Sequence, residues 1–466
     1  MPPIRKGLFV FRLNSSWVGE TRETFKLAWP LVAAQMAQHA LQTTDVIMMG
    51  WLGPESLAAG SLGSSVMFPL FLFCIGTVSA VATLVSQALG ARDLRSVRRA
   101  VRQGMWVAFL LCSIVIAMMF FIKDILLLLG QQEETANLSA TYIEYASWAI
   151  IPGCWIIVLR SFVSAHGSTM VVLLITIIGI FVNALGNYAL MFGNFGFPRL
   201  ELAGAGISTT LVNSVMFLLI LIYILLHRRF RRYEILVRFW KPDWPSFIGI
   251  LKLGTPIGLM LTAETGLFAF AFVMMGWIST DALAAHAVAL QLAGISFMVP
   301  LGLSLATNIR VGLAYGRKSN DGIMRAGWVS IIMAIAFMSV TCVLFLAIPG
   351  PLVSLFLDTE LSRNAIPLML AGQFLAVAGL FQLVDGAQVI AASALRGLGD
   401  TAVPMYAAIF GYWACGAVVS YIFGFVFGWG GVGIWAGLAA GLGFVAVVLV
   451  IRFARRERLG LLPVAS

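Results

Sequence analysis

The chain has 466 residues, of which 60% are hydrophobic and 11% charged, and its mean hydropathy is +0.96. Soluble domains carry about 25% charged residues and at most about half apolar ones, so this composition excludes an ordinary soluble protein. Because a helix that crosses a bilayer needs about 20 apolar residues, the length accommodates roughly ten to fourteen crossings. No room is left for a large soluble domain.

Hydropathy predicts twelve membrane-spanning helices. In chain order they cover residues 26–50, 58–88, 103–123, 142–161, 168–192, 205–227, 250–277, 283–309, 326–348, 366–392, 402–424 and 432–451. Each of these segments is apolar over a spanning length. The loops between them are short, so the protein is expected to act in or across the lipid bilayer.

The distribution of positive charge predicts the orientation of these spans. When the 30 Lys and Arg residues are assigned to alternate connections, 27 lie on one side, and only Lys123, Arg199 and Arg363 lie on the other. Loops rich in Lys and Arg stay in the cytoplasm. Both termini are therefore expected to be cytoplasmic. The net charge of +10 reflects this topology and does not indicate nucleic-acid binding.

The first half of the chain repeats in the second half at an offset of 226 residues, without a gap across 76 residues. Phe25–Pro30 aligns with Leu251–Pro256. Met48–Trp51 aligns in the same way with Met274–Trp277. Because the offset moves the first span onto the seventh, both halves have the same orientation, which is the parallel-repeat plan of many secondary transporters.

The repeat predicts an all-α integral membrane fold, with twelve transmembrane helices in two pseudo-symmetric six-helix bundles and a central cleft. The N-terminal lobe is expected to comprise residues 1–240, including a basic linker from about residue 228, and the C-terminal lobe residues 241–466. In such proteins the substrate path lies between the lobes, and access alternates as one lobe rocks against the other.

Three acidic residues lie inside predicted spans, whereas the other 17 of the 20 Asp and Glu residues fall in loops or at span ends. The three are Asp45 in the first span, Glu264 in the seventh and Asp385 in the tenth. A charge inside the membrane costs at least about 2.5 kcal/mol on insertion scales. These carboxylates therefore indicate a function, whereas basic residues inside the spans are expected to be nearly absent.

A polar stripe on the first span ends at the first of these acids. The stripe consists of Gln35, Gln38, Gln42 and Asp45. Spacings of 3, 4 and 3 residues place these side chains on one helix face, which cannot face lipid. In the fifth span, Asn183 and Asn187 lie one turn apart and are expected to hydrogen-bond Asp45 in either protonation state. The alternative is that these amides only hold helices together.

Glu264 and Asp385 are expected to form a site for a dehydrated monovalent cation, with Na⁺ as the metal. Each has a phenylalanine one turn away, Phe268 after Glu264 and Phe381 before Asp385. Carboxylates supply negative charge, and the face of an aromatic ring attracts cations. For the two phenylalanines, ordinary core packing is at least as good an explanation.

The two halves do not carry their acids at equivalent positions. The offset of 226 places Glu264 over Gln38, and it places Asp45 over Ala271. Each half therefore has its own acidic site on a duplicated scaffold. The candidate cation–π or substrate cleft comprises Phe268, Phe381, Gln38, Gln42 and Gln388.

The sequence resembles the MATE (multidrug and toxic compound extrusion) transporters, specifically their bacterial NorM-type branch, over essentially its whole length. The resemblance rests on Pro30 with Asp45, Phe181–Asn187, Phe192–Pro198, Leu202–Gly206, Glu264 with Phe268, Ala284–Leu290, Ile309–Gly312 and Asp385–Gly397 followed by Gly399–Thr401. The last string is the most specific. Phe381 departs from the pattern, because a tyrosine is familiar there.

This resemblance implies a twelve-helix, two-lobe antiporter of the cell inner membrane. It implies export of small organic cations and drugs in exchange for Na⁺ or H⁺, with no cofactor. By position, Glu264 and Asp385 match the family's cation site in the C-terminal lobe. Asp45, Asn183 and Asn187 match its protonation network in the N-terminal lobe.

Pro30 is expected to kink the first span, because a proline inside a helix removes a hydrogen bond. The chain is further expected to be a monomer and not an enzyme. Gly428–Gly433 fits a dinucleotide-binding spacing, but no strand precedes it.

Two alternatives remain open from the sequence. A flippase for lipid-linked oligosaccharides, from the same superfamily, would need basic residues in its cleft to hold pyrophosphate. A membrane-embedded enzyme or channel is disfavoured because no catalytic or filter motif is present.

Overall fold

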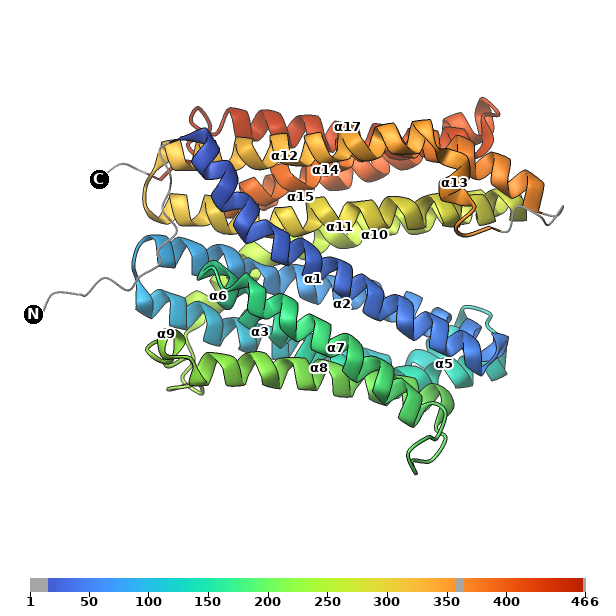
Figure 1. The fold of residues 1–466 in the computed structure, drawn as a ribbon, viewed down its shortest axis with the longest axis horizontal. Coiled ribbons are helices and arrows are strands. Elements are labelled where there is room, and N and C mark those ends of the chain that lie inside the picture. The colour runs from blue at the N-terminus through green and yellow to red at the C-terminus, as the bar shows by residue number, and fades with distance from the viewer. Residues whose placement is uncertain (1–15, 358–363, 464–466) are drawn as a thin grey trace, which may run out of the picture.

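The computed structural model describes residues 16–357 and 364–463, and every regular element in these ranges is a helix (Figure 1). The first half contains α1 (Trp17–Leu52), α2 (Pro54–Gly90), α3 (Leu94–Met119), α4 (Ile122–Leu128), α5 (Glu133–Ala146), α6 (Ile150–Ala165), α7 (Thr169–Leu190) and α8 (Glu201–Leu226). A short helix, α9 (Arg228–Arg231), follows. The second half contains α10 (Trp244–Ile278), α11 (Thr280–Gly316), α12 (Asn320–Ala347), α13 (Pro349–Val353), α14 (Ala365–Gly397), α15 (Ala402–Ile409), α16 (Val418–Tyr421) and α17 (Gly430–Ala454).

Local sequence signals explain where the first helices begin and end. The Ser16 side chain caps α1 by accepting a hydrogen bond from the Gly19 amide at 3.0 Å. Asp93 caps α3 by accepting from two backbone amides. Between α1 and α2 the chain turns at Gly53, whose φ of 128° suits a residue without a Cβ.

Eleven helical segments of the described chain are long and apolar enough to cross a membrane, with Glu133–Ala165 and Ala402–Val426 each taken as one segment. They correspond to the second to twelfth predicted spans. The first predicted span lies in α1, which has 36 residues but carries the polar stripe and several charges. Eleven spans are therefore found by composition, and a crossing by α1 stays a prediction.

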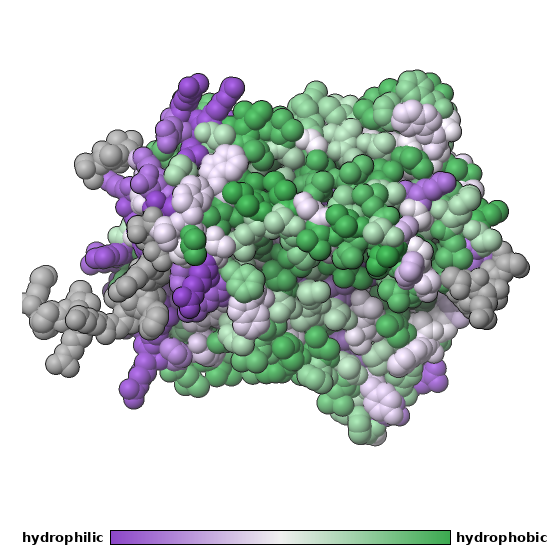
Figure 2. Space-filling view, turned by 45° about the horizontal axis from the view of Figure 1, so that its top comes forward, coloured by the Kyte–Doolittle hydropathy of each residue, from purple (hydrophilic) through white to green (hydrophobic). Residues whose placement is uncertain are grey.

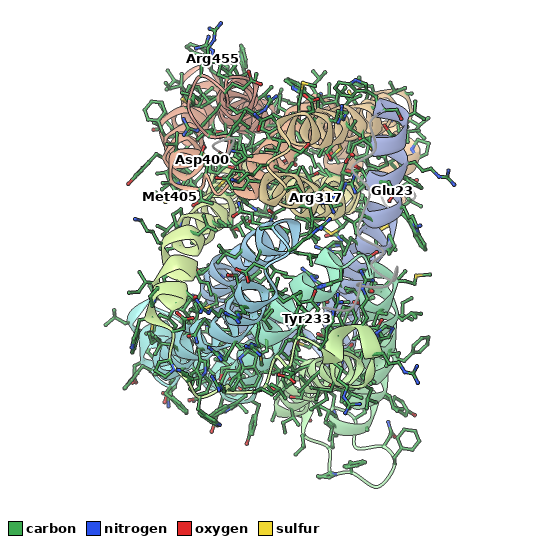
Figure 3. All side chains as sticks on the ribbon, turned by 90° about the vertical axis from the view of Figure 1, so that its left-hand side faces the viewer. Glu23, Tyr233, Arg317, Asp400, Met405 and Arg455 are labelled. Carbon is green, nitrogen blue, oxygen red and sulfur yellow. The ribbon has the colours of Figure 1, made fainter. Side chains whose placement is uncertain are left out.

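The helices form two groups that lie side by side along the long axis of the molecule (Figure 1). The helices α2 to α8 make the first group, and α10 to α17 make the second. The first helix runs obliquely across both, because it packs against α7 in the first group and against α11 and α12 in the second. In the end-on view, the first turns of α1 at Glu23 lie beside the group that contains Arg317 and Arg455 (Figure 3).

Close contacts between the two groups lie along the second half of α2. Gly76 approaches the backbone of Gly258 in α10 so closely that a Cβ on either glycine would collide. Further along α2, Thr83 Oγ1 donates a hydrogen bond to Asn308 Oδ1 of α11 at 2.9 Å. One turn later, Gln87 Nε2 donates to a backbone carbonyl at the end of α14 at 2.9 Å.

A fully buried ion pair joins α1 to α11. Arg310 donates from Nε to Glu20 Oε1 at 2.8 Å and from one terminal nitrogen to both carboxylate oxygens at 2.6 Å. The first predicted span begins at residue 26, after Glu20. The helix begins earlier, at Trp17, and its first turn packs against the second group.

Most of the surface in Figure 2 is hydrophobic, and hydrophilic residues gather at one end of the molecule. The hydrophilic end is the one where α1 begins and α17 ends (Figure 1). The basic segment after α8 lies at this end and is held by α3: Arg102 donates to the Arg238 carbonyl and Trp106 to the Phe239 carbonyl, both at 3.0 Å.

Candidate functional site

Asp45 of α1 is paired with α7 by two hydrogen bonds. Its Oδ1 accepts from Asn183 Nδ2 and from Asn187 Nδ2, each at 2.7 Å. Both asparagines are fully buried, whereas Asp45 is half-buried. The asparagines lie one turn apart on α7, so both amides reach the same carboxylate oxygen. The hydrogen bonds expected from the sequence are therefore present.

The rest of the polar stripe on α1 has varied surroundings. Gln35 Oε1 accepts from an Arg160 terminal nitrogen of α6 at 3.2 Å. Gln38 is half-buried and Gln42 is exposed. Pro30 lies inside α1 and is buried. Just after it, the backbone of α1 at Val32 packs so tightly on Gly302 of α11 that no Cβ would fit there.

Glu264 of α10 and Asp385 of α14 lie close enough for their charges to interact. Asp385 is 5% exposed, and its Oδ1 has no hydrogen-bond partner in the described part of the chain. Gln388, one turn further along α14, makes a side-chain hydrogen bond with Glu264. The Gln388 Oε1 is also buried without a partner among the described residues.

Tyr412 completes this cluster and was not found by sequence analysis. It lies in a π-helical stretch, Phe410–Ala417, between α15 and α16, and is fully buried. Its hydroxyl accepts a hydrogen bond from Gln388 Nε2 and hydrogen-bonds Glu264. Stretches of π-helix often occur at functional sites. The signal in the sequence was a hydroxyl within an apolar span, which alone is not specific.

Arg396 brings a positive charge to the same cluster. It lies in α14 eleven residues after Asp385, which is three turns along the same face. Its charge acts on Glu264, and its terminal nitrogen lies 3.7 Å from Met260 Sδ, one turn before Glu264. Sequence analysis assigned Arg396 to a loop, which is wrong because the helix continues to Gly397.

Basic residues inside the spanning segments are therefore not nearly absent, contrary to the expectation from the sequence. Arg160, Arg310 and Arg396 all lie within spanning helices. Each has a partner inside the protein: an amide oxygen, a carboxylate and the Glu264 charge, respectively. None of the three forms the cluster of basic groups that a pyrophosphate would need.

The two phenylalanines of the candidate cleft contact each other. The Phe268 and Phe381 rings meet edge to face, with centroids 6.1 Å apart. Phe381 is 2% exposed and also contacts Trp435 edge to face, with centroids 5.7 Å apart. Phe381 is thus part of the aromatic core, while the half-buried Phe268 packs beside Glu264.

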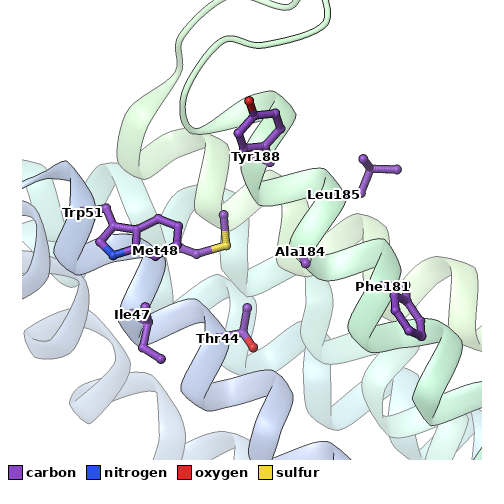
Figure 4. A pocket seen from close by; sticks show the side chains of 8 residues that line it. All are labelled: Thr44, Ile47, Met48, Trp51, Phe181, Ala184, Leu185 and Tyr188. Carbon is purple, nitrogen blue, oxygen red and sulfur yellow. The ribbon is translucent and has the colours of Figure 1, made fainter.

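Two cavities lie beside α1. The larger, of about 680 Å³, lies between α1 and α7 (Figure 4) and is lined by Thr44, Ile47, Met48, Trp51, Phe181, Ala184, Leu185 and Tyr188. The smaller, of about 390 Å³, lies between α1 and α11 and is lined by Met36, His39, Ala40, Thr43, Thr44, Ile295 and Met298. The second cavity therefore has walls from both halves. Most side chains in both cavities are apolar.

We call the group of side chains around Glu264 the C-half cluster; it comprises Glu264, Asp385, Gln388, Arg396 and Tyr412. Its oxygen atoms suit a small hard cation. Carboxylate, amide and phenol oxygens are the ligands that such cations prefer. The unpaired Oδ1 of Asp385 and Oε1 of Gln388 supply two of them. No group of three or more His, Cys, Asp or Glu that could hold a metal ion is found among the described residues, so such a cation would be held by amide and phenol oxygens as well as by the two carboxylates.

Comparisons with known proteins find similar sequences over most of the chain. The family model described as MatE matches residues 30–189 and 256–422, two segments that begin 226 positions apart. A probable multidrug resistance protein NorM from Mesorhizobium japonicum is 43% identical over 445 residues, which is 95% of each chain. The protein of the same description from Brucella suis is 44% identical over 441 residues, 94% of each chain.

Solved structures show the same fold at low sequence identity. An outward-facing multidrug resistance transporter of the MATE family aligns with a TM-score of 0.86 at 20% identity, covering 98% of this chain and 99% of the other. The eukaryotic MATE transporter AtDTX14 aligns with a TM-score of 0.82 at 20% identity, covering 96% of this chain and all of the other. The all-helical membrane fold expected from the sequence is thereby confirmed.

Proposed function

Since the chain belongs to the MATE family of multidrug efflux transporters, we propose that it exports small organic cations from the cytoplasm in exchange for inward-moving Na⁺ or H⁺. Its relatives are named as transport proteins and not as enzymes. The chain is therefore a transporter, and the proposal concerns the coupling ion and the residues that carry it.

The observation that carries the proposal is the charge and the unpaired oxygens of the C-half cluster. The charge of Arg396 acts on Glu264, and the charge of Glu264 acts on Asp385 in turn. Two carboxylates and one guanidinium leave one net negative charge when both acids are ionised. A single monovalent cation balances that charge. The oxygens of Asp385 and Gln388 that lack a partner are the atoms that it would contact.

Exchange follows from competition for the same negative charge. In a low dielectric, two carboxylates that interact must share a proton or a cation. Binding of Na⁺ or H⁺ at Glu264 and Asp385 lowers the attraction that an organic cation feels in the protein. The coupling ion therefore releases the drug on the outside, and loss of that ion to the cytoplasm restores the attraction.

Asp45 is proposed to act as a separate proton carrier in the N-half. Its oxygen accepts hydrogen bonds from two amides that stay neutral at any pH. These donors stabilise the ionised acid, while a protonated Asp45 can keep them through the same oxygen. No basic side chain within the described chain forms an ion pair with Asp45, so nothing there locks the acid in its charged form.

The membrane potential limits the stoichiometry. Moving one charge through 100 mV is worth about 2.3 kcal/mol. A 1:1 exchange of two monovalent cations moves no net charge and draws only on the concentration gradient. Acidic sites in both halves allow a second coupling ion, which would add the membrane potential as a driving force.

The drug is proposed to pass between the halves by alternating access, with lobes at residues 1–240 and 241–466. The cavity between α1 and α11 has walls from both lobes, and its volume lies within the usual range of about 300–1,000 Å³ for ligand pockets. Its lining is mostly apolar and includes His39, which suits a lipophilic cation. Gln38 and Gln42 lie on the same helix, α1, and are candidate contacts. Of the other residues predicted for the cleft, Gln388 and Phe381 are buried in the C-half, where Phe268 contacts Phe381.

For topology, we propose twelve crossings, cytoplasmic termini and a monomer in the inner membrane. The basic segment 228–241 begins with α9, which lies at the end of the molecule where α1 begins (Figure 1), and this end is hydrophilic (Figure 2). Basic segments stay inside. Cysteines introduced one at a time into this segment should resist a membrane-impermeant thiol reagent in intact cells and react in inside-out vesicles. Labelling from the outside would contradict the twelve-span arrangement.

Transport in inside-out membrane vesicles tests the exchange itself. Uptake of a fluorescent organic cation is measured under a Na⁺ gradient alone, a pH gradient alone, and neither. We expect uptake with one of the two gradients and no uptake without a gradient. The matched control is the Asp45→Asn, Glu264→Gln, Asp385→Asn triple variant, and equal uptake by this variant would refute ion coupling at these acids.

A further inference from the structure

The fully buried His286 is not explained by the exchange sites. It lies near the start of α11 with its ring between Phe272 of α10, at a centroid distance of 4.6 Å, and Trp435 of α17, at 5.4 Å. Neither ring nitrogen has a hydrogen-bond partner among the described residues. A histidine ring always presents at least one N–H donor. An unmet polar group in a protein interior costs about 1–3 kcal/mol.

Trp435, like His286, has a buried polar atom without a hydrogen-bond partner among the described residues. It is the largest of the fully buried side chains, and its indole Nε1, which can only donate, has no partner in the described part of the chain. The ring contacts His286 on one side and Phe381 on the other. Phe381 is one helical turn from Asp385, so this pair lies beside the C-half cluster.

Unpaired polar atoms continue from this pair along α14. Gln382 donates to the Ala293 carbonyl at 3.1 Å and to Ser296 Oγ at 2.7 Å, both on α11, while its own Oε1 is buried without a partner among described residues. Asp385 and Gln388 follow at intervals of three residues, each with the unpaired oxygen noted above. These spacings keep the side chains on one face of α14, which packs against α11.

The row of atoms leads toward one end of the molecule. His286 and Trp435 lie within the first two turns of α11 and α17. Both helices begin at the end opposite to the hydrophilic, basic end (Figures 1 and 2). Under the proposed topology, that is the outer end. Buried water meets the needs of polar atoms grouped in this way.

We propose that His286 and Trp435 hold water molecules that connect the outer end of the C-half to Asp385. This row of side chains (His286, Trp435, Gln382, Asp385 and Gln388) forms the entry path of the coupling cation. It is separate from the cavity between α1 and α11, so ion and drug reach the protein by different routes. The inference rests on the proposed ion coupling and names the path that serves it.

Radiolytic footprinting of the purified protein in lipid nanodiscs tests for the water directly. Hydroxyl radicals made from bound water oxidise the side chains next to it, even when these are inaccessible from outside. We expect oxidation of Trp435 and His286. Phe374, which is also buried in the hydrophobic core, serves as the unlabelled control. Absence of label on both Trp435 and His286 overturns the proposal.

Exchange kinetics test the path. In His286→Phe and Trp435→Phe, ²²Na⁺ exchange and proton uptake after a pH jump should slow by about tenfold, the change expected for loss of about one hydrogen bond. Binding of the organic cation should be unchanged. The matched control is Trp155→Phe, whose indole N–H already bonds the Met105 carbonyl at 2.9 Å, and its exchange rates should stay at the wild-type level.

Asp385→Asn in the same assay separates failure of the path from failure of the function. If Asp385→Asn abolishes cation exchange while both His286→Phe and Trp435→Phe leave the rates unchanged, the path is wrong and the coupling site stands. If Asp385→Asn also leaves the rates unchanged, the coupling site itself is wrong, and the inference falls with it. Thermal melting of each variant confirms that it is folded.

Discussion

The two acidic sites of this transporter differ in the polar groups that surround their carboxylates. In the N-half, one acid, Asp45, receives two hydrogen bonds from neutral amides. In the C-half, Glu264 interacts with an amide, a phenol and a guanidinium, while Asp385 lies beside Glu264 and keeps one oxygen without a partner among the described residues. The first arrangement suits exchange of a proton, and the second leaves free oxygens for a metal cation as well.

The comparison also teaches that duplication fixed the scaffold and not the chemistry. The family model matches two segments that begin 226 residues apart, yet none of the three acids inside the spans, Asp45, Glu264 and Asp385, overlies an acid of the other half at that offset. Because the two sites consist of different residues at different positions, a substitution in one site is expected to leave the other site unchanged.

The largest effect is expected where the two halves are joined. Glu20→Gln removes the carboxylate of a fully buried ion pair with Arg310, and breaking such a pair costs about 3–5 kcal/mol. Thermal melting in detergent should drop sharply. The control is Glu23→Gln. Glu23 lies three residues later on the same helix and is not part of the ion pair, so this variant should melt as the wild type does.

Cation binding by Glu20→Gln tests whether the C-half site depends on the contact between the two halves. If the C-half site is built only from its own half, Glu20→Gln should still bind ²²Na⁺ at temperatures where it stays folded. Loss of binding in the folded variant would mean that the site depends on the junction between the halves.

The second largest effect is expected from removing the acids of the C-half. Glu264→Gln, Asp385→Asn and the double variant should each weaken cation binding by about 100-fold, equivalent to about 2.8 kcal/mol, because removing either ligand destroys a shared site. Calorimetry or ²²Na⁺ binding measures this. Glu55→Gln, an exposed acid, is the control. Fully additive losses would show two separate sites.

Asp45→Asn should leave the protein folded and cation binding in the C-half intact, but remove proton-coupled export. The new amide still accepts the hydrogen bonds of Asn183 and Asn187, yet it cannot carry a proton. Vesicle uptake driven by a pH gradient is the measurement, and Val46→Ala, an exposed position on the same helix, is the control. Wild-type uptake by Asp45→Asn would assign this acid to helix packing.

A smaller effect is expected from Tyr412→Phe. The variant keeps the aromatic ring and loses the hydroxyl that bonds Glu264 and Gln388, so cation affinity should fall by about tenfold, the effect of one hydrogen bond to a charged group. Tyr406→Phe in the same span is exposed and serves as the control. Unchanged affinity would show that Tyr412 only fills space.

The smallest effect concerns the basic end of the N-half. His166 hydrogen-bonds Tyr233 of the linker at 2.7 Å, and burial, aided by the charges of Arg229 and Arg232, lowers the pKa of His166 to about 4. Because an unfolded histidine has a pKa of about 6.5, the folded state loses stability as the pH falls from about 6.5 toward 4, and none above that window.

Hydrogen exchange measures this effect. Exchange of linker amides at residues 228–243 should rise between pH 7 and pH 5 after correction for intrinsic rates. In His166→Gln, which cannot gain a charge, the rise should be absent. An equal rise in both proteins would show that His166 does not hold the linker.

Much of the candidate site could be predicted from the sequence, because two strong rules act along a single chain. The bilayer excludes unpaired charge, so Asp45, Glu264 and Asp385 stand out in apolar segments. Helical periodicity then shows which residues share a face, and this placed Asn183 and Asn187 as one pair of donors. Both rules need only local information.

Only the tertiary structure decided which faces meet. Glu20 and Arg310 are 290 residues apart, and nothing near either residue shows that α1 crosses to the other half. Tyr412 and Arg396 likewise join the cluster through the packing of α10, α14 and the π-helical stretch. Helix packing depends on the shapes of surfaces brought together from distant parts of the chain, and no local pattern encodes that contact.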